Sequence, residues 1–277
     1  MTHVPLGLRD YLPQDIQQRE TIIKKMADVV KQSGYQRIIT PTIERFDLVR
    51  TGLGTLSNQC IMFFDGGGSR LVLRPDHTTA IARISSSRLS HELPIKLFYH
   101  DSVFRKDPVL GETEIYQFGF EHIGSLSIFD ELKMIHMVSK ICDAVGLKDY
   151  QIHLAHPEIL RQYGDDQLNA LRQGNLIPFN ELPRIGQSEL ASEFEYLGQL
   201  YSKSNLNELD NVYINLGLYK DPAYYNGVYF DVVSSAYGKV LGSGGRYDSV
   251  LNSFDLNANA FGFAFRLHYL ERALDQQ

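Results

Sequence analysis

The chain has 277 residues, 43% of them hydrophobic, and a formal net charge of −6. This length and composition predict a soluble globular protein of one or two domains with a sizeable core. The negative charge and the lack of any long run of lysine and arginine argue against sequence-independent binding to a phosphate backbone. Nucleic acid is therefore not an expected partner.

The first part of the chain predicts one long helix followed by short strands. Apolar residues recur at helical spacing between residues 13 and 33, and Gly34 supplies a stop, which predicts an amphipathic helix. The segment 35–41 (YQRIITP) is rich in β-branched residues. In the segment 60–75 (CIMFFDGGGSRLVLRP), three glycines separate two apolar runs, so we expect a hairpin and not a phosphate-binding loop.

The middle of the chain predicts two antiparallel strands between two helices. Residues 76–88 (DHTTAIARISSSR) are predicted to be helical. The segments 95–105 and 114–124 alternate in character, as strands with two different faces do. Ser127 and Asp130 form a capping box ahead of a helical apolar pattern, so a long helix is expected to pack on the sheet.

The last part of the chain changes character twice. From residue 156 to 209, short polar helices are broken by glycine and proline, which predicts an inserted helical subdomain. Strand patterns return in 211–219, 224–235 and 238–244, and residues 260–274 predict a strand that continues into a helix. Hairpin-type strands with helices outside them, and no regular βα alternation, predict an α+β fold around an antiparallel sheet and argue against a dinucleotide-binding fold.

Several kinds of site have no supporting pattern. His153, His156 and Glu158 lack a further ligand at a recognised spacing, so neither a metal nor another cofactor is expected. There is no nucleophile elbow and no cysteine with a histidine close in sequence, so no catalytic nucleophile is expected. Cys60 and Cys142 are isolated in apolar contexts, and no signal sequence or membrane-spanning stretch is present. These features favour the cytoplasm, with no membrane partner.

Polar residues on otherwise apolar strands are the main candidates for a binding site, because they are costly to bury without a partner. Gln117, Gly119 and Glu121 share one face of a strand, and Gly119 leaves room for a small ligand between the amide and the carboxylate. The other members of this polar set are Arg74, Asp76, Thr78 and Arg105. The alternative is that the set forms internal ion pairs without any ligand, Arg105 with Glu121 or Arg74 with Asp76.

Six segments resemble one enzyme family in order and spacing: GLRDYLP, GYQRIITPTIE, LRPDHTTAIAR, VFRKD…YQFGFEHIG, AYYNGVYFDVV and GGRYD. The resemblance is to the catalytic domain of histidyl-tRNA synthetase, a class II aminoacyl-tRNA synthetase, and it covers nearly the whole chain. It implies an antiparallel sheet of six or seven strands flanked by helices. It also implies a dimer formed through the segment 34–41 and a histidine pocket on the sheet.

The resemblance implies three pairs of histidine-binding residues in that pocket: Asp76 and Thr78, Arg105 and Gln117, and Glu121 and Tyr225. In that order, the pairs are similar to residues that receive the α-amino group, lie near the carboxylate, and contact the imidazole. The chemistry agrees, because an ammonium needs carboxylate and hydroxyl acceptors, a carboxylate needs a guanidinium, and an imidazole N–H needs an anionic acceptor. Asp76 is one methylene shorter than the glutamate usual in the family.

The ATP-binding part of the family pattern is largely absent. The loop positions where the family has two arginines are Gly111 and Thr113, with glutamates beside them. The arginine that acts on the α-phosphate falls near Lys220 or is absent, and a lysine is a point charge without the planar fork of a guanidinium. The arginine of the closing motif falls on Tyr269. Because transfer from ATP depends on positioned positive charge, adenylation is not expected.

The chain ends soon after the closing motif, so residues 1–277 are not expected to include the anticodon-binding domain of a synthetase. With the amino-acid pocket present and the ATP-binding arginines absent, the chain resembles the family of ATP phosphoribosyltransferase regulatory subunits. That resemblance implies no catalysis by the chain itself, assembly with the short catalytic subunit for the first step of histidine biosynthesis, and feedback control by histidine. The alternative is a free-standing ATP-dependent aminoacylating or amidating enzyme, which requires the missing arginines.

Overall fold

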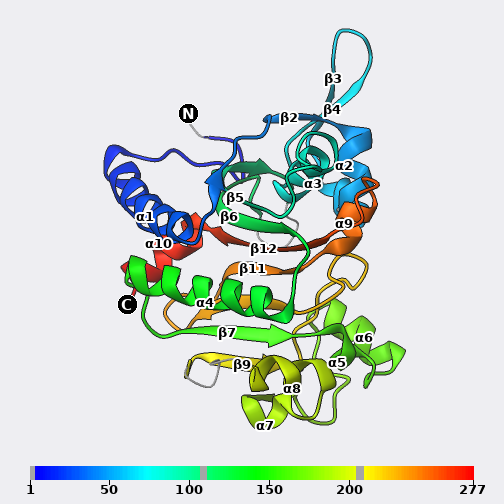
Figure 1. Ribbon diagram of the computed structural model, residues 1–277. Helices are drawn as coiled ribbons and strands as arrows, with labels where there is room; N and C mark the ends of the chain where they lie inside the picture. The colour runs from blue at the N-terminus through cyan, green and yellow to red at the C-terminus, as the bar shows by residue number, and fades with distance from the viewer. Residues whose placement is uncertain (1–3, 107–110, 204–208) are drawn as a thin grey trace.

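The computed structural model describes residues 4–106, 111–203 and 209–277. Within these residues, nine strands form one large sheet (Figure 1). In spatial order they are β1 (Gln36–Arg37), β5 (Ile95–Phe104), β6 (Glu114–Gly124), β12 (Asn259–Arg266), β11 (Val240–Arg246), β10 (Tyr229–Ser234), β7 (Tyr150–Ala155), β9 (Val212–Asn215) and β8 (Ile185–Gly186). The long strands β5, β6, β12 and β11 are antiparallel neighbours, and they form the part of the sheet on which the polar set lies.

The predicted α+β class is confirmed, but the sheet is larger than the six or seven antiparallel strands that the resemblance implies. Strands β1 and β8 have two residues each, too few to show a period-two pattern in the sequence. Two neighbouring pairs, β1 with β5 and β7 with β9, are parallel. Parallel neighbours need a long crossover. Between β7 and β9 that crossover is the segment 156–209.

The helices lie on both sides of this sheet and at one end of it (Figure 1). They are α1 (Pro13–Gln32), α2 (Phe46–Leu53), the 3-10 helix η1 (Gly54–Gln59), α3 (Thr78–Ser87), α4 (Ile128–Val145), α5 (Pro157–Leu160), α6 (Asp165–Arg172), α7 (Ser188–Ala191), α8 (Glu195–Ser202), α9 (Asp248–Asn252) and α10 (Leu267–Asp275). The predicted capping box of α4 is confirmed, since the backbone N–H of Ser127 donates to Asp130 Oδ2 at 3.0 Å. Helices α5 to α8 lie next to β7 and β9.

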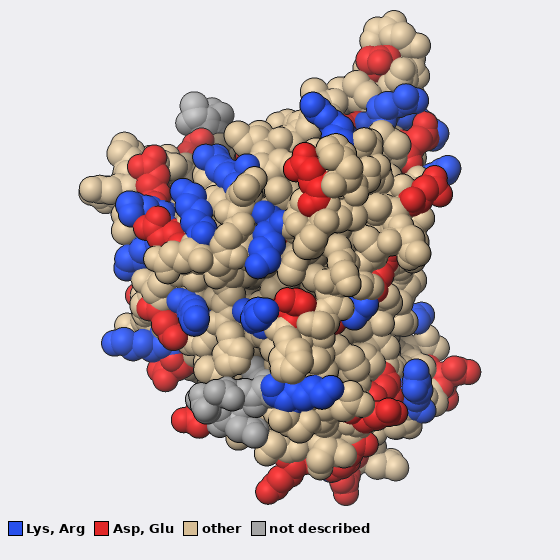
Figure 2. All heavy atoms as spheres, viewed as in Figure 1, with Lys and Arg blue, Asp and Glu red and all other residues tan. Residues whose placement is uncertain are grey.

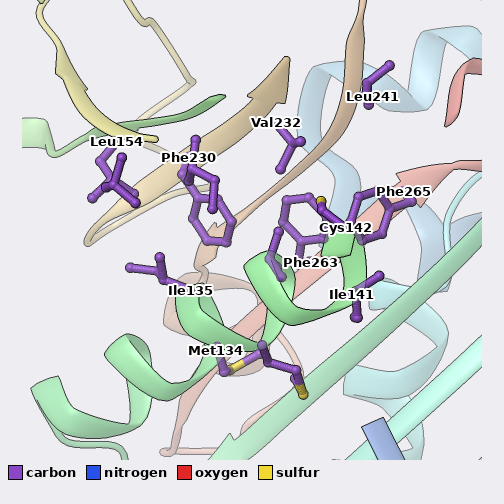
Figure 3. Close-up of a cluster of buried hydrophobic side chains, with 14 of the residues drawn as sticks. Met134, Ile135, Ile141, Cys142, Leu154, Phe230, Val232, Leu241, Phe263 and Phe265 are labelled. Carbon is purple, nitrogen blue, oxygen red and sulfur yellow. The ribbon is translucent and has the colours of Figure 1, made fainter. Parts of the chain in front are cut away.

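The main core lies between the sheet and α4 (Figure 3), where apolar side chains of α4 contact phenylalanines of the strands. Side chains alternate along β6, so Phe118 and Phe120 are fully buried in this core while Gln117 and Glu121 lie on the opposite face. Each phenylalanine buried in this way contributes roughly 2 kcal/mol to the free energy of unfolding. The core thus fixes which face of β6 its polar residues occupy.

A three-stranded sheet and two helices cover part of the opposite face. Strands β2 (Ile43–Arg45), β4 (Arg70–Leu73) and β3 (Met62–Phe64) form the small sheet, and the predicted hairpin between β3 and β4 is confirmed. Helices α3 and α9 pack with Leu97 and Ile123 in a second apolar cluster. None of the helices in the described part of the chain is both long enough and apolar enough to span a membrane.

Candidate functional site

A cavity of about 440 Å³ lies on the face of the sheet opposite to α4. All six residues to which the resemblance assigns contacts with histidine line it: Asp76, Thr78, Arg105, Gln117, Glu121 and Tyr225. They come from the β4–α3 connection, from the ends and middle of the central strands, and from the loop before β10. The fold therefore brings residues from distant parts of the chain to one hollow.

Glu121 is the most enclosed acid in the cavity, with 2% of its surface exposed. The hydroxyl of Tyr247 donates to its Oε2 at 2.6 Å, and those of Tyr99 and Thr78 donate to its Oε1 at 3.3 and 3.2 Å. Burial raises the pKa of Glu121 to about 7, and these hydroxyl donors only partly oppose that effect. The carboxylate is thus held by neutral donors, which position it without neutralising its charge.

Asp76 is a second, partly buried acid in the same cavity. Its carboxylate accepts hydrogen bonds from the backbone N–H and the hydroxyl of Thr79 at 3.3 and 3.1 Å. Burial raises the pKa of Asp76 to about 6, against the lowering effects of Thr79 and of the Arg105 guanidinium. Arg105 Nη1 also donates to the carbonyl of Pro75 at 2.8 Å. Two acids with raised pKa values in one cavity form a setting that favours a cationic ligand.

The ion pairs of the alternative interpretation are not the contacts that these residues form. Arg74, which is 1% exposed, forms an ion pair with Asp101 at 3.0 Å and donates to the carbonyls of Thr40 and Ser102. Its partner is therefore not Asp76, and Arg74 stabilises the junction of the small sheet with β5. The donors to Glu121 are three hydroxyl groups and not Arg105.

The expectation that Gly119 leaves room for a ligand is wrong. Tyr99 lies directly opposite Gly119 on β5, and a Cβ atom at Gly119 would lie 2.4 Å from the Tyr99 phenol. The absence of a side chain at Gly119 thus makes room for Tyr99, which donates to Glu121. Gly262 on β12 makes room for the Glu121 carboxylate, because a Cβ atom there would lie 1.5 Å from Glu121 Oε2.

Of the aromatic lining of the cavity, sequence reasoning named Tyr225 and missed His77, Tyr99, Tyr224 and Tyr247. His77 stacks on Tyr99 with ring centroids 4.0 Å apart, and burial lowers the pKa of His77 to about 3, so its ring is neutral. Tyr224 and Tyr225 pack edge to face with centroids 4.8 Å apart. Tyr99 could have been found by the glycine opposite it on the next strand. Tyr224 lies in the irregular segment before β10, and Tyr247 lies at the junction between β11 and α9, where no period indicates which way a side chain points.

Two of the cations that line the cavity, Lys220 and Arg266, already have acidic partners. Lys220 Nζ lies 2.8 Å from Asp231 Oδ1, which also accepts a hydrogen bond from the Ser243 hydroxyl at 2.6 Å. Arg266 Nη1 lies 3.4 Å from Glu112 Oε2. Sequence reasoning recognised neither Asp231 nor Arg266, because the partners lie on separate strands or loops.

The positions where the family has ATP-binding arginines are occupied by contacts within the chain. The backbone N–H of Thr113 donates to the carbonyl of Gly7 at 2.9 Å, and its hydroxyl donates to the carbonyl of Leu6 at 3.3 Å. Residues 107–110 of the same loop lie outside the described residues. Tyr269 is buried, with the Arg266 guanidinium 5.5 Å from the centroid of its ring. In the part of the chain that the structure describes, no three histidine, cysteine or acidic side chains are grouped to hold a metal ion.

Comparison with known proteins gives concordant matches. Residues 7–176 and 179–270 match a family model described as histidyl-tRNA synthetase. Curated ATP phosphoribosyltransferase regulatory subunits from Lysinibacillus sphaericus and Carboxydothermus hydrogenoformans are 30% and 28% identical to the chain. These alignments cover 100% and 98% of this chain, and 83% and 96% of the two relatives.

Solved structures agree with these matches. A crystal structure described as an ATP phosphoribosyltransferase regulatory subunit/histidyl-tRNA synthetase from Bacillus halodurans has a TM-score of 0.87 and 26% identity, covering 99% of this chain and 83% of that chain. Apo histidyl-tRNA synthetase from S. aureus has a TM-score of 0.75 and 22% identity, covering 100% of this chain and 71% of that chain. At that identity the second match concerns the fold alone.

Proposed function

The chain belongs to the ATP phosphoribosyltransferase regulatory subunits, a histidyl-tRNA synthetase-like family, and we propose that it is a regulatory subunit of this kind in the cytoplasm, with no catalysis of its own. It assembles with the short catalytic subunit in the first step of histidine biosynthesis and makes that subunit sensitive to histidine. The observation that carries the proposal is the contrast within the cavity. Two enclosed or partly buried acids and an arginine suited to an amino acid are present, while Lys220 and Arg266 are paired with acids of the chain.

Histidine is the proposed ligand of the cavity. A volume of about 440 Å³ suits a small molecule. Asp76 and the oxygen of Thr78 receive the ammonium, and Arg105 and Gln117 lie near the carboxylate. Glu121 accepts the imidazole N–H, with Tyr225 beside the ring. Support for the last assignment comes from the three hydroxyl donors that hold Glu121 and leave its charge uncompensated.

The proposed lack of adenylation is supported by the ion pairs that Lys220 and Arg266 form within the chain. A triphosphate needs several cations that are not already neutralised. Lys220 and Arg266 each have an acidic partner, and the matched arginine positions hold Gly111, Thr113 and Tyr269. Binding of ATP there would require these ion pairs to break, with little positive charge gained.

Feedback requires that histidine favours one arrangement of the complex over another by roughly 1–3 kcal/mol.

We propose that the chain dimerises through the segment 34–41. This segment contains β1 at the edge of the main sheet and Ile39, which is 72% exposed. Residues 156–209 are proposed to be an inserted helical subdomain within one synthetase-like domain, supported by the position of α5–α8 at one end of the sheet (Figure 1).

Co-expression with a short ATP phosphoribosyltransferase catalytic subunit tests the proposal. We expect the two chains to copurify, the catalytic subunit to be active only in the complex, and histidine to inhibit that activity. The chain alone should catalyse no histidine-dependent exchange of pyrophosphate into ATP and should not bind tRNA at physiological salt. Measurable exchange without copurification would favour the ATP-dependent alternative instead.

A further inference from the structure

A groove of about 420 Å³ lies on the same face of the sheet as α4, opposite to the cavity. Tyr35 and His122 form its floor, and Lys96, Lys133 and Lys140 are the lysines that line it. The other lining residues are Ser33, Asp130, Met134, His136 and Met137. No part of the proposed function uses this groove.

The fold places these side chains together in a simple way. Lys96 and His122 are direct cross-strand partners on β5 and β6, so their side chains lie on one face. Lys133 and Lys140 are seven residues apart on α4, which returns them to one side of the helix. Tyr35 packs edge to face on Phe120, and Lys96 Nζ lies 5.7 Å from the centroid of the Tyr35 ring.

Two mostly buried side chains on the floor have polar atoms without a hydrogen-bond partner among the described residues. Tyr35 is 5% exposed and His122 is 7% exposed. Neither the Tyr35 hydroxyl nor a ring nitrogen of His122 is fully enclosed, so these polar atoms remain accessible from the groove. Burial lowers the pKa of His122 to about 4, so at neutral pH its ring is uncharged and has one N–H to donate. The floor therefore offers two donors to a ligand.

The charges around the floor favour an anion. Lys133 is 75% exposed and lies 3.4 Å from Asp130, the one acid that lines the groove, while Lys96 donates to the carbonyl of Ser33 at 3.3 Å. Three ammonium groups against one carboxylate leave an excess of positive charge, on a chain whose net charge is −6. Figure 2 shows lysine and arginine side chains over α1 and α4 on this face, with aspartate and glutamate side chains between them.

We infer that the groove binds a compact, multiply charged oxyanion, such as inorganic pyrophosphate or the phosphate group of a small metabolite. The floor donors hydrogen-bond its oxygens while the three ammonium groups balance its charge. A single carboxylate would leave most of that positive charge unbalanced. The inference is independent of histidine binding, because the groove and the cavity lie on opposite faces of the sheet.

Calorimetric titration of the full chain with inorganic pyrophosphate, at about 0.15 M ionic strength to screen distant charges, tests the inference. We expect one saturable site. Tyr35→Phe removes only a hydroxyl that has no protein partner, so it should weaken binding about two- to tenfold without lowering thermal stability. Lys140→Glu should weaken it at least as much. Lys148→Glu changes the net charge equally outside the groove and should leave affinity within about twofold.

Several results would overturn the inference. No saturable binding, equal losses in Lys140→Glu and Lys148→Glu, or full affinity in Tyr35→Phe would each mean that the groove is not a site for a small anion. Binding of a polyglutamate peptide that pyrophosphate does not displace, and that Lys140→Glu abolishes, would assign the groove to an acidic segment of a partner protein instead.

Discussion

The charged residues of the cavity fall into two groups that differ in how far the protein compensates their charge. In the acidic group, Glu121 accepts hydrogen bonds from hydroxyl groups, and Asp76 accepts them from Thr79 and is only partly compensated by the Arg105 guanidinium. In the paired group, Lys220 is paired with Asp231 and Arg266 with Glu112. The comparison teaches that side-chain type alone does not define a binding site. What matters is whether the protein has already compensated the charge.

The uncompensated acids carry a cost in folding stability. Burial disfavours their charged forms and raises both pKa values, to about 7 for Glu121 and about 6 for Asp76. A bound ammonium or imidazole N–H would offset that cost, so a ligand that fits this end should also stabilise the fold. The ion pairs of Lys220 and Arg266 need no ligand to offset a cost of buried charge.

Gly262→Ala should produce the largest effect on the acidic group, Glu121 and Asp76. The new Cβ would lie 1.5 Å from Glu121 Oε2, so the carboxylate must leave its hydroxyl donors. We expect histidine affinity to fall by about two powers of ten or more and the free energy of unfolding to fall by about 3 kcal/mol. Calorimetry with histidine and urea unfolding measure the two effects.

Gly66→Ala is the matched control for this substitution, because its Cβ would meet no atom within 4 Å in the β3–β4 turn. It should change the free energy of unfolding by less than about 0.5 kcal/mol. Equal behaviour of the two variants would mean that Glu121 can move away from Gly262 at little cost, and the description of a fixed carboxylate would fail.

Glu121→Gln tests the charge of the same group without changing its size. A charge-assisted hydrogen bond contributes roughly 1.5–3 kcal/mol, so histidine affinity should fall by about one to two powers of ten. The reconstituted complex should still assemble and turn over, with inhibition by histidine shifted to higher concentration. Glu193→Gln, on an exposed ion pair with Arg184, is the control. An unchanged inhibition curve would mean that histidine acts elsewhere.

Much of the site could be predicted from the sequence, and the failures have a common physical cause. The period of two along β6 correctly placed Gln117 and Glu121 on one face, because a strand segment determines its own alternation. The polar set also contained Asp76, Thr78 and Arg105, and the family resemblance added Tyr225; all four share the cavity, although their contacts with histidine remain predictions. The role of Gly119 was wrong because the space above a glycine depends on the neighbouring strand, here on Tyr99.

Contacts between separate segments also limited the prediction of the fold and of the ion pairs in the cavity. Long helices and strands such as α1, α4 and β6 were predictable from periodicity, whereas the two-residue strands at the sheet edges were not. Lys220 was considered alone in the sequence, as a weak substitute for an arginine. Its partner Asp231 lies on β10 and becomes apparent only when the loop before that strand folds back over the sheet.

The raised pKa of Glu121 predicts a pH dependence of stability with a definite sign. Between the ordinary value of 4.5 and about 7, the folded state binds a proton that the unfolded state does not, so this group lowers stability as pH rises through that window. Glu121→Gln lacks this effect, so its free energy of unfolding should gain about 3 kcal/mol relative to the original protein between pH 4.5 and 7.5. Urea unfolding at both values measures it. A difference that stays constant with pH would contradict the assigned ionisation.

The smallest effect on histidine binding is expected for the Lys220–Asp231 pair, in the double variant Lys220→Met with Asp231→Asn. Removing both charges of this partly buried pair can be nearly neutral for stability, whereas Lys220→Met alone leaves the buried Asp231 carboxylate without its cation and should destabilise the fold more. Because this pair is already compensated and is not assigned to histidine, the double variant should bind histidine within about threefold of the original affinity, less than one power of ten or 1.4 kcal/mol. Calorimetry on the two variants, with urea unfolding for stability, separates the contributions. A tenfold loss of affinity in the double variant would show that Lys220 and Asp231 take part in binding histidine. The division of the cavity's charged residues into an acidic and a paired group would then be wrong.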